Sequence, residues 1–270
     1  MKYLAYAKIN IRLNVIGKNE QNYHNLSMVN AKITLADEIE IHESSDNVVQ
    51  YSLDELNHLE NDMCLNVLNE LSDKFNIQKK YYIYIKKNIP LGAGLGGGSS
   101  DVACIINAID ELNNLNISLE EKIKIGLKYG ADVPYCLINS LALVEGIGEK
   151  ITLLNAKLNQ RIALVYPNIF VSTKEVFKNV QKNSFSNKKE ELEKLIINKE
   201  YNKLLYNDLE EASFKLEPRL KEIKTILNEI SNTVMSGSGS SMLVFIENDE
   251  EFEMINKVFP DFLIVDTYTL

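Results

Sequence analysis

Glycine is concentrated at a few places in this 270-residue chain, and the densest cluster has a pattern that suits anion binding. The stretch Pro90-Leu-Gly-Ala-Gly-Leu-Gly-Gly-Gly-Ser-Ser-Asp101 joins a strand pattern to a helical pattern. Glycine there permits positive φ angles and lets backbone N–H groups approach an anion closely. The helix that follows adds partial positive charge at its N-terminus. The stretch therefore predicts a loop that binds the phosphates of a nucleoside triphosphate.

Other nucleotide-binding motifs do not fit the sequence around this loop. Gly92, Gly94 and Gly97 satisfy the dinucleotide-binding spacing G-x-G-x-x-G. A dinucleotide-binding unit continues as strand, helix, strand, whereas here a second helical pattern follows the first, and Asp110 lies inside the first helix. A Walker A loop and the protein-kinase motifs are missing from the sequence. The loop therefore indicates another kind of nucleotide-binding fold.

Two further residues have the chemistry of phosphoryl transfer. Lys8 and Asn10 lie on the polar face of an alternating strand, and Asp132 follows the Gly130 that ends a helical pattern. A carboxylate can accept or orient a hydroxyl proton, and an ammonium can offset charge on the transferring phosphoryl group. On local sequence alone, the favoured interpretation is different: Asp132 would cap a short helix at Pro134, and Lys8 would be an exposed strand residue.

Hydrophobic periodicity predicts the elements that must position these residues. Strands are expected at residues 7–15, 28–35, 39–42, 81–86, 161–166, 242–246 and 262–266. Helices are expected at residues 64–75, after the glycine loop, from Ser118 to Gly130, from Ser172, at 187–203, at 217–230 and between the last two strands. We expect an α+β fold of two domains, residues 1–155 and 156–270, with the active site between them.

Composition limits the kinds of partner that the chain can have. With 45% hydrophobic and 25% charged residues, the chain has the balance of a globular protein, and the net charge of -9 opposes nucleic-acid binding. The sequence contains no apolar run long enough for a bilayer and no signal-peptide pattern, so we expect a cytoplasmic protein without membrane partners. The three cysteines lack metal-binding or disulfide spacing. We expect no dedicated metal site, and a monomer or weak homodimer.

The glycine stretch resembles the phosphate loop of GHMP kinases. Its long form, with Gly-Gly-Gly before Ser-Ser-Asp, is similar to the version in the kinases of 4-diphosphocytidyl-2-C-methyl-D-erythritol. Five more segments match that family in order: Ala7-Lys-Ile-Asn10, Gly130-Ala-Asp-Val-Pro134, Glu145-Gly-Ile-Gly-Glu149, Asn207-Asp-Leu-Glu210 and Ser236-Gly-Ser-Gly-Ser240. The resemblance implies an N-terminal catalytic α/β domain and a smaller C-terminal ferredoxin-like α/β domain. It also implies ATP with Mg²⁺, and phosphorylation of the acceptor's 2-hydroxyl in the non-mevalonate isoprenoid precursor pathway.

The resemblance also assigns roles to individual residues. It makes Asp132 the catalytic aspartate and Lys8 the lysine paired with it. The ATP site would comprise Pro90, Gly92, Gly94, Leu95, Gly96, Gly97, Gly98, Ser99 and Ser100, with Asp62 near the adenine and Ser99 or Ser100 near the metal ion. The acceptor site would comprise Asn10, Tyr23, His24, Phe177, Gly237 and Ser238, of which Tyr23, His24 and Phe177 would form an aromatic clamp on the cytosine.

Two positions depart from the family pattern, and other functions compete. Asn22 stands where the family usually has glycine, and Asp62 stands where it often has asparagine. Asparagine tolerates a left-handed φ, so we expect the turn before Tyr23 to survive.

The alternative functions are another GHMP kinase acting on mevalonate derivatives, homoserine or a sugar, a nucleotide-binding relative without catalysis, and an oxidoreductase. Lys8 and Asp132 speak against a relative without catalysis.

Overall fold

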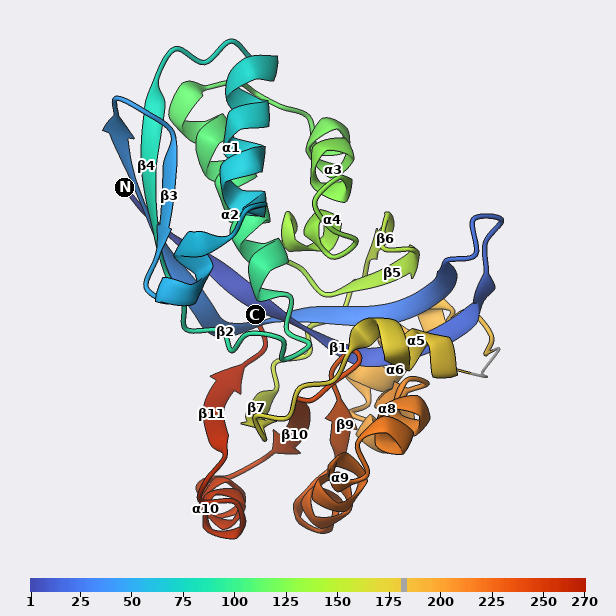
Figure 1. Cartoon of the computed structure of the whole chain (residues 1–270). Helices are drawn as coiled ribbons and strands as arrows, with labels where there is room; N and C mark the ends of the chain where they lie inside the picture. The colour runs from blue at the N-terminus through green and yellow to red at the C-terminus, as the bar shows by residue number, and fades with distance from the viewer. Residues whose placement is uncertain (181–183) are drawn as a thin grey trace. The chain divides into compact units, whose positions relative to one another are not determined.

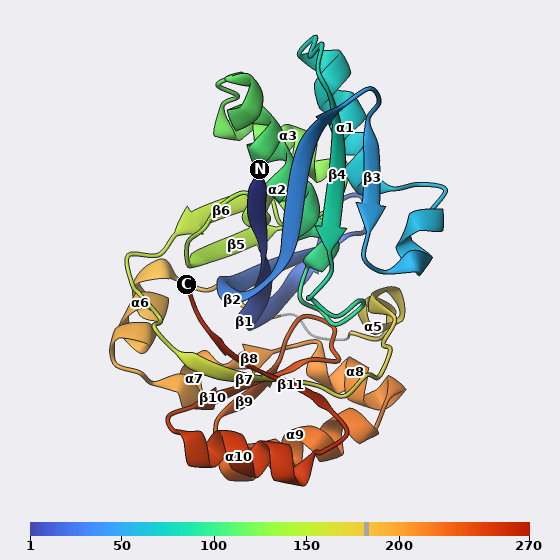
Figure 2. The same ribbon diagram turned by 90° about the vertical axis from the view of Figure 1, so that its left-hand side faces the viewer.

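The computed structural model describes residues 1–180 and 184–270, and the chain divides into two compact units. The first unit comprises Met1–Ala7, Leu35–Pro90 and Gly96–Asn139, and the second comprises Lys8–Thr34, Leu91–Leu95 and Ser140–Leu270. Figures 1 and 2 show the course of the chain and the element labels. Strands β1 (Lys2–Lys18) and β2 (His24–Ser44) each contribute residues to both units.

The first unit places helices on a small sheet. Strand β3 (Val48–Tyr51) pairs parallel with β4 (Lys80–Lys86), which pairs antiparallel with residues 38–44 of β2. The helical segments are η1 (Asp54–His58), α1 (Met63–Lys74), α2 (Gly97–Asn113), α3 (Leu119–Leu127) and α4 (Val133–Cys136). Helices α1 and α2 lie side by side on one face of the sheet (Figures 1 and 2). The core joins the apolar stripe of α2, including Val102, Ile105, Ile106 and Ile109, to residues of β4 and α1.

The second unit contains a ferredoxin-like sheet. Its strands are β7 (Arg161–Tyr166), β9 (Thr233–Met235), β10 (Met242–Ile246) and β11 (Leu263–Tyr268), antiparallel in the order β11-β7-β10-β9. Helices α9 (Arg219–Ile230) and α10 (Asp249–Val258) cover one face of it (Figures 1 and 2). The succession of strand, helices, two strands, helix and strand is the β-α-β-β-α-β arrangement.

The rest of the second unit surrounds its parts of β1 and β2. Strand β5 (Ala142–Gly146) pairs antiparallel with residues 26–30 of β2 and with β6 (Lys150–Leu153), while β8 (Tyr206–Asn207) pairs parallel with β1 at Arg12 and Leu13. The remaining helices are α5 (Thr173–Asn179), α6 (Lys189–Ile197), α7 (Tyr201–Leu204) and α8 (Glu210–Leu216). No helix among the described residues is both long and apolar enough to cross a membrane.

Three expectations from the sequence were wrong in detail. The strands predicted at 28–35 and 39–42 are one strand, because Asp37 between them is fully buried in an ion pair with Lys87 and does not form a turn. The helix predicted at 187–203 is two helices, α6 and α7, separated where Lys199 adopts a φ of 54°. Helix α3 ends at Leu127, so Gly130 is not its C-cap. The domain boundary at residue 155 stays a prediction.

Candidate active site

Three glycines of the predicted phosphate loop have the positive φ angles that the sequence predicted. Gly92, Gly94 and Gly96 have φ angles of 64°, 76° and 65°, which is the left-handed region. Gly96 is the N-cap of α2, and Ser100 N donates to Gly96 O over 2.8 Å. The N–H groups in the first turn ahead of Ser100 have no carbonyl partner within the helix, so this turn can bind an anion.

A buried ion cluster in the first unit supports the same turn. Lys87 Nζ, at the end of β4, donates to Asp37 Oδ2 and, over 2.5 Å, to Asp101 Oδ2 in the first turn of α2. The three side chains are at most 2% exposed. Asp37 Oδ1 also accepts from the backbone N–H groups of Asn88 and Ile89 at 2.6 and 2.8 Å. This cluster was not predicted from the sequence, although the position of Lys87 directly after a predicted strand and shortly before the glycine loop could have indicated it.

The charges in this cluster are unevenly stabilised. Burial raises the pKa of Asp101 to about 8 and outweighs the attraction of Lys87, whose charge is shared with Asp37. Asp101 Oδ1 has no hydrogen-bond partner among the residues that the structure describes. Burial alone would lower the pKa of Lys87, but the two carboxylates together raise it. At neutral pH the structure therefore favours a protonated Asp101.

The two serines of the loop have different surroundings. Ser100 is 2% exposed, and its hydroxyl lies 2.8 Å from Tyr6 O, to which it donates, and 3.3 Å from Cys136 Sγ. The Ser100 hydroxyl therefore ties α2 to residues of its own unit. Ser99 is half-buried and lies next to Gly130, where an added Cβ would come 3.4 Å from Ser99 Oγ. Ser99 is the better placed of the two to meet a ligand.

Asp132 and Asp62 occupy helix N-cap positions in the first unit. Asp132 precedes α4, which has Pro134 in its first turn, but in the described part of the chain its side chain accepts no capping hydrogen bond. The capping alternative from local sequence is therefore wrong for its carboxylate. Asp62 does cap α1, since its Oδ1 accepts from Cys64 N at 2.8 Å and from Tyr51 OH at 2.7 Å. Asp62 has a structural task whatever its role toward adenine.

In the second unit, Lys8 and Asn10 are buried together. Lys8 is 5% exposed, so the alternative of an exposed strand residue is wrong. Lys8 Nζ donates to Asn10 Oδ1 over 3.0 Å. Asn10 N donates to Ser236 Oγ, which in turn donates to Gly94 O over 3.1 Å. Through Ser236, these bonds join β1 to Gly94 of the glycine loop. The two glycine motifs also pack closely, since a Cβ at Gly94 would lie only 2.6 Å from Ser236 O.

The structure brings together two of the three residues predicted to hold cytosine. The rings of His24, at the start of β2, and Phe177, on α5, have centroids 5.2 Å apart and planes 31° apart. Burial, and then Lys18, lower the pKa of His24, so its imidazole is neutral at pH 7. Tyr23, which directly precedes His24 in the sequence, is 66% exposed. Asn22 has a φ of 65°, which confirms that asparagine can make the turn in place of glycine.

The remaining acceptor-site candidates, Gly237 and Ser238, are held by other residues of the second unit. Asn207 Nδ2 donates to Met235 O and Gly237 O over 2.7 and 2.8 Å. The hydroxyls of Ser238 and Thr173 are hydrogen-bonded at 2.7 Å, and Thr173 is the first residue of the helix that carries Phe177. The family-like segment 207–210 therefore anchors the glycine motif, a role that sequence analysis did not assign.

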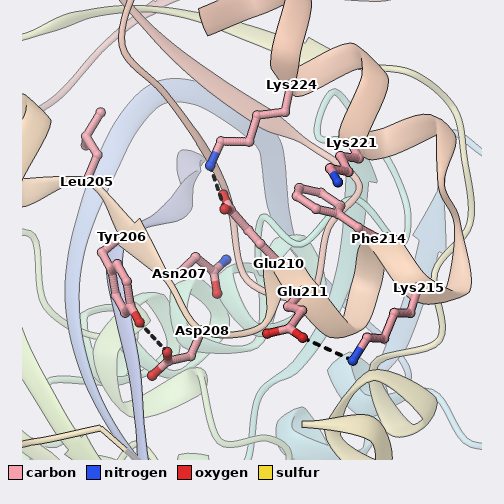
Figure 3. A pocket seen from close by; sticks show the side chains of 10 residues that line it. All are labelled: Leu205, Tyr206, Asn207, Asp208, Glu210, Glu211, Phe214, Lys215, Lys221 and Lys224. Carbon is pink, nitrogen blue, oxygen red and sulfur yellow. Dashed lines mark hydrogen bonds and ion pairs between the residues drawn. The ribbon is translucent and has the colours of Figure 1, made fainter. Parts of the chain in front are cut away.

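Figure 3 shows a pocket of about 550 Å³ in the second unit that contains none of the predicted ligand-binding residues. It is lined by Leu205, Tyr206, Asn207, Asp208, Glu210, Glu211, Phe214, Lys215, Lys221 and Lys224. Its charges are largely paired, since Lys224 binds Glu210 at 2.5 Å and Lys215 binds Glu211 at 3.1 Å.

Comparison with known proteins identifies the family. The family models named GHMP kinases N terminal domain and GHMP kinases C terminal match residues 62–140 and 179–263. A relative from Clostridium perfringens (strain 13 / Type A) is 40% identical over 258 residues, which cover 92% of this chain and 89% of that protein. The chain belongs to the GHMP kinases. The Clostridium perfringens relative of this GHMP kinase is named 4-diphosphocytidyl-2-C-methyl-D-erythritol kinase.

Other comparisons agree. A relative of the same name from Clostridium botulinum (strain Alaska E43 / Type E3) is 35% identical over 99% of this GHMP kinase and 100% of its own length. The crystal structure of a 4-(cytidine 5'-diphospho)-2C-methyl-D-erythritol kinase superposes with a TM-score of 0.84 and 24% identity over 100% of both chains. A homoserine kinase from Cytophaga hutchinsonii has a TM-score of 0.74 and 17% identity over 100% of this chain and 94% of its own. Both structures share the fold.

Family membership confirms three predictions made from the sequence. The chain has the fold of GHMP kinases, it is a phosphotransferase, and its phosphoryl donor is ATP. The oxidoreductase suggested by the literal glycine spacing is not supported. The roles of individual residues remain predictions that the geometry of each unit constrains.

Proposed function

We propose that this GHMP kinase transfers the γ-phosphoryl group of ATP to the 2-hydroxyl of 4-diphosphocytidyl-2-C-methyl-D-erythritol, a step of the non-mevalonate isoprenoid precursor pathway. The observation that carries the proposal is the contact between His24 and Phe177, whose ring centroids are 5.2 Å apart. The names of relatives at 35% and 40% identity support the same acceptor. Mevalonate, homoserine and simple sugars have no planar base that an aromatic pair could recognise by stacking.

The cytidine end of the acceptor is the part that this aromatic pair would recognise. Stacking on an aromatic ring contributes about 1–3 kcal/mol per base but distinguishes bases poorly. A neutral His24 has one ring nitrogen that donates a hydrogen bond and one that accepts, so it can read the base edge. We assign base selection to His24, and stacking to Phe177 and Tyr23. Asn10, Gly237 and Ser238 would bind the rest of the acceptor.

Chemistry at the acceptor hydroxyl is assigned to Asp132 and Lys8. The carboxylate of Asp132, which precedes the short helix α4, has the chemistry to accept or orient the hydroxyl proton. Lys8 would offset the charge that spreads over the transferring phosphoryl group. Because such transfer usually passes through a loose transition state, orientation of the hydroxyl contributes more than its full deprotonation.

ATP is assigned to the glycine loop and the first turn of α2. Mg²⁺ would accompany it, since metal ions bridge nucleotide phosphates in phosphoryl transfer. Among the residues that the structure describes, no group of three or more His, Cys, Asp or Glu side chains could hold a metal ion. The Ser99 hydroxyl fits the task of a single protein ligand to a phosphate-bound Mg²⁺, whereas the Ser100 hydroxyl is buried and already bonded to Tyr6 O.

The proposal extends to the setting of the enzyme. A net charge of -9 disfavours binding to nucleic acid, which leaves small molecules as the partners. We propose a cytoplasmic monomer or weak homodimer. Size-exclusion chromatography with light scattering measures the oligomeric state.

ADP release by the purified protein tests the proposed acceptor. The panel contains ATP, Mg²⁺ and, separately, 4-diphosphocytidyl-2-C-methyl-D-erythritol, mevalonate, homoserine and galactose. We expect the cytidine compound to give the highest kcat/KM by a wide margin, and mass spectrometry to find one added phosphoryl group on it. A higher kcat/KM with any other acceptor would overturn the assignment and leave the family unchanged.

A further inference from the structure

The side-chain amide of Asn10 has a defined orientation, because one neighbour can only donate hydrogen bonds. A protonated lysine has three N–H donors and no acceptor. Lys8 Nζ lies 3.0 Å from Asn10 Oδ1, so the oxygen of that amide must face Lys8. The Asn10 Nδ2 group is thereby turned to the opposite side, where it needs an acceptor. Asn10 is 1% exposed, so bulk water does not supply one.

Asn30, on the neighbouring strand β2, supplies that acceptor. Asn10 Nδ2 donates to Asn30 Oδ1 over 2.7 Å, while its other neighbour, Met28 Sδ at 3.5 Å, is a weak acceptor. Asn30 is 0% exposed, and its own Nδ2 has no hydrogen-bond partner in the described part of the chain. An unpaired buried N–H group is costly. Among the described residues, the only side-chain hydrogen bond given for the Asn30 amide is therefore the one that its oxygen accepts from Asn10.

Lys8 sets the direction of the hydrogen bonds in the series that runs from Lys8 through Asn10 to Asn30. If the Asn10 amide rotated by half a turn, its N–H₂ group would face the Lys8 ammonium and its oxygen would face Asn30 Oδ1. Both contacts would be repulsive, the first between donors and the second between acceptors. With Asn30 in place, a single orientation of Asn10 satisfies both neighbours. With an apolar residue at position 30, the Nδ2 side would keep the weak acceptor Met28 Sδ and lose the amide oxygen.

We propose that Asn30 is a positioning residue for phosphoryl transfer: its side-chain oxygen fixes the Asn10 amide, and the Asn10 oxygen in turn fixes the Lys8 ammonium. The inference rests on the proposed role of Lys8 in transfer, and it does not depend on which acceptor the enzyme phosphorylates. Asn30 touches no reacting group itself.

Two substitutions of Asn30 test the proposal. Asn30→Leu keeps a similar volume and removes the acceptor, whereas Asn30→Asp keeps an oxygen at the same reach. We expect Asn30→Leu to lower kcat about 10- to 100-fold, the effect of losing support for a hydrogen bond to a charged group, with KM for ATP within about twofold. Asn30→Asp should keep most of the wild-type kcat, because it retains an acceptor oxygen for Asn10. Asn30→Ala is the second variant if the leucine disturbs folding.

A matched control separates positioning from simple destabilisation. Asn14 is on the same strand as Asn10, is 4% exposed and accepts a hydrogen bond from Asn187 rather than from the Lys8 series. Asn14→Leu should lower the melting temperature comparably and leave kcat within about twofold. In a Lys8→Ala background, Asn30→Leu should cause no further loss of single-turnover rate, because both changes remove the same effect.

The measurements use whichever acceptor of the panel the wild-type enzyme phosphorylates, so a wrong acceptor assignment does not affect them. An independent readout is hydrogen exchange of the Asn10 side-chain amide in asparagine-labelled protein, which should be slow in wild type and Asn30→Asp and fast in Asn30→Leu. Unchanged kcat in Asn30→Leu, an equal loss in Asn14→Leu, losses that add in the Lys8→Ala background, or equal exchange in all variants would overturn the proposal.

Discussion

Replacing Asp101 by asparagine should remove a large part of the pH dependence of stability. Asp101 is 2% exposed on its side chain, in the first turn of α2, and burial raises its pKa to about 8 from the ordinary 3.8. Asparagine has nearly the same shape as a protonated carboxyl group and does not titrate. The variant therefore imitates the state that the folded enzyme favours at neutral pH, without the penalty of holding a proton there.

The magnitude follows from proton linkage. Between pH 3.8 and about 8 the unfolded chain has released the proton of Asp101, whereas the folded chain keeps it. Folded protein then binds more protons than unfolded protein, so the free energy of unfolding falls as pH rises, by about 1.4 kcal/mol per pH unit. From pH 5 to pH 7 the wild type should lose about 2–3 kcal/mol that Asp101→Asn does not lose. Above pH 8 the two curves should run parallel.

Urea unfolding at pH 5, 6 and 7 measures this difference, because other titrating groups cancel when the variant is compared with wild type. Asp110→Asn is a matched control on the same helix, where the carboxylate is paired with Lys122 at 2.7 Å and both side chains are 14% exposed. A constant free-energy difference between wild type and Asp101→Asn across these pH values would refute the reasoning. So would a change of slope that Asp110→Asn reproduces.

Three further predictions concern the active site. Asp132→Asn and Lys8→Ala should each lower kcat about 10²- to 10⁴-fold and leave ATP binding intact, and near-wild-type turnover with rate-limiting transfer would contradict the assignment. His24→Ala should raise the acceptor KM and weaken the preference for a cytidine over a uridine acceptor, whereas Phe177→Ala should weaken binding of both acceptors alike. Steady-state kinetics with both analogues measures this, and an effect confined to the KM for ATP would contradict the cytosine clamp. Gly94→Ala should destabilise the protein by at least about 1–2 kcal/mol, because alanine at a φ of 76° is strained and its Cβ would lie 2.6 Å from Ser236 O. A urea midpoint equal to that of wild type would mean that the loop relaxes.

Elements with a strong local pattern could be predicted from the sequence. Strands β7 and β10 have the predicted bounds, 161–166 and 242–246, because each is a short apolar run that the fold buries almost completely. Helix α3 begins where the Ser118 capping box predicted, with Ser118 Oγ accepting from Glu121 N. In each case the residues that specify the element lie within a few positions of one another.

Elements that depend on distant partners were not predictable in this way. The break predicted between residues 35 and 39 is absent because Asp37 is neutralised by Lys87, which is 50 positions away. The two-residue strand β8 exists only through its pairing with Arg12 and Leu13 of β1. A charged residue in a sequence normally indicates a surface or a turn. No local pattern predicts that a residue of opposite charge, distant in the sequence, will be buried beside it.

The same difference separates the candidate ligand-binding residues from those that hold them. Lys8, Gly94 and Ser236 lie in motifs that the sequence reveals, yet the bonds that join these motifs span 226 positions from Asn10 to Ser236 and 142 from Ser236 to Gly94. Asn30 belongs to no motif, and only the direction of the hydrogen bonds from Lys8 through Asn10 identifies it. A lysine that only donates imposes an order on every amide linked to it. Support residues of this kind can therefore be found by following the donors outward from a fixed charge.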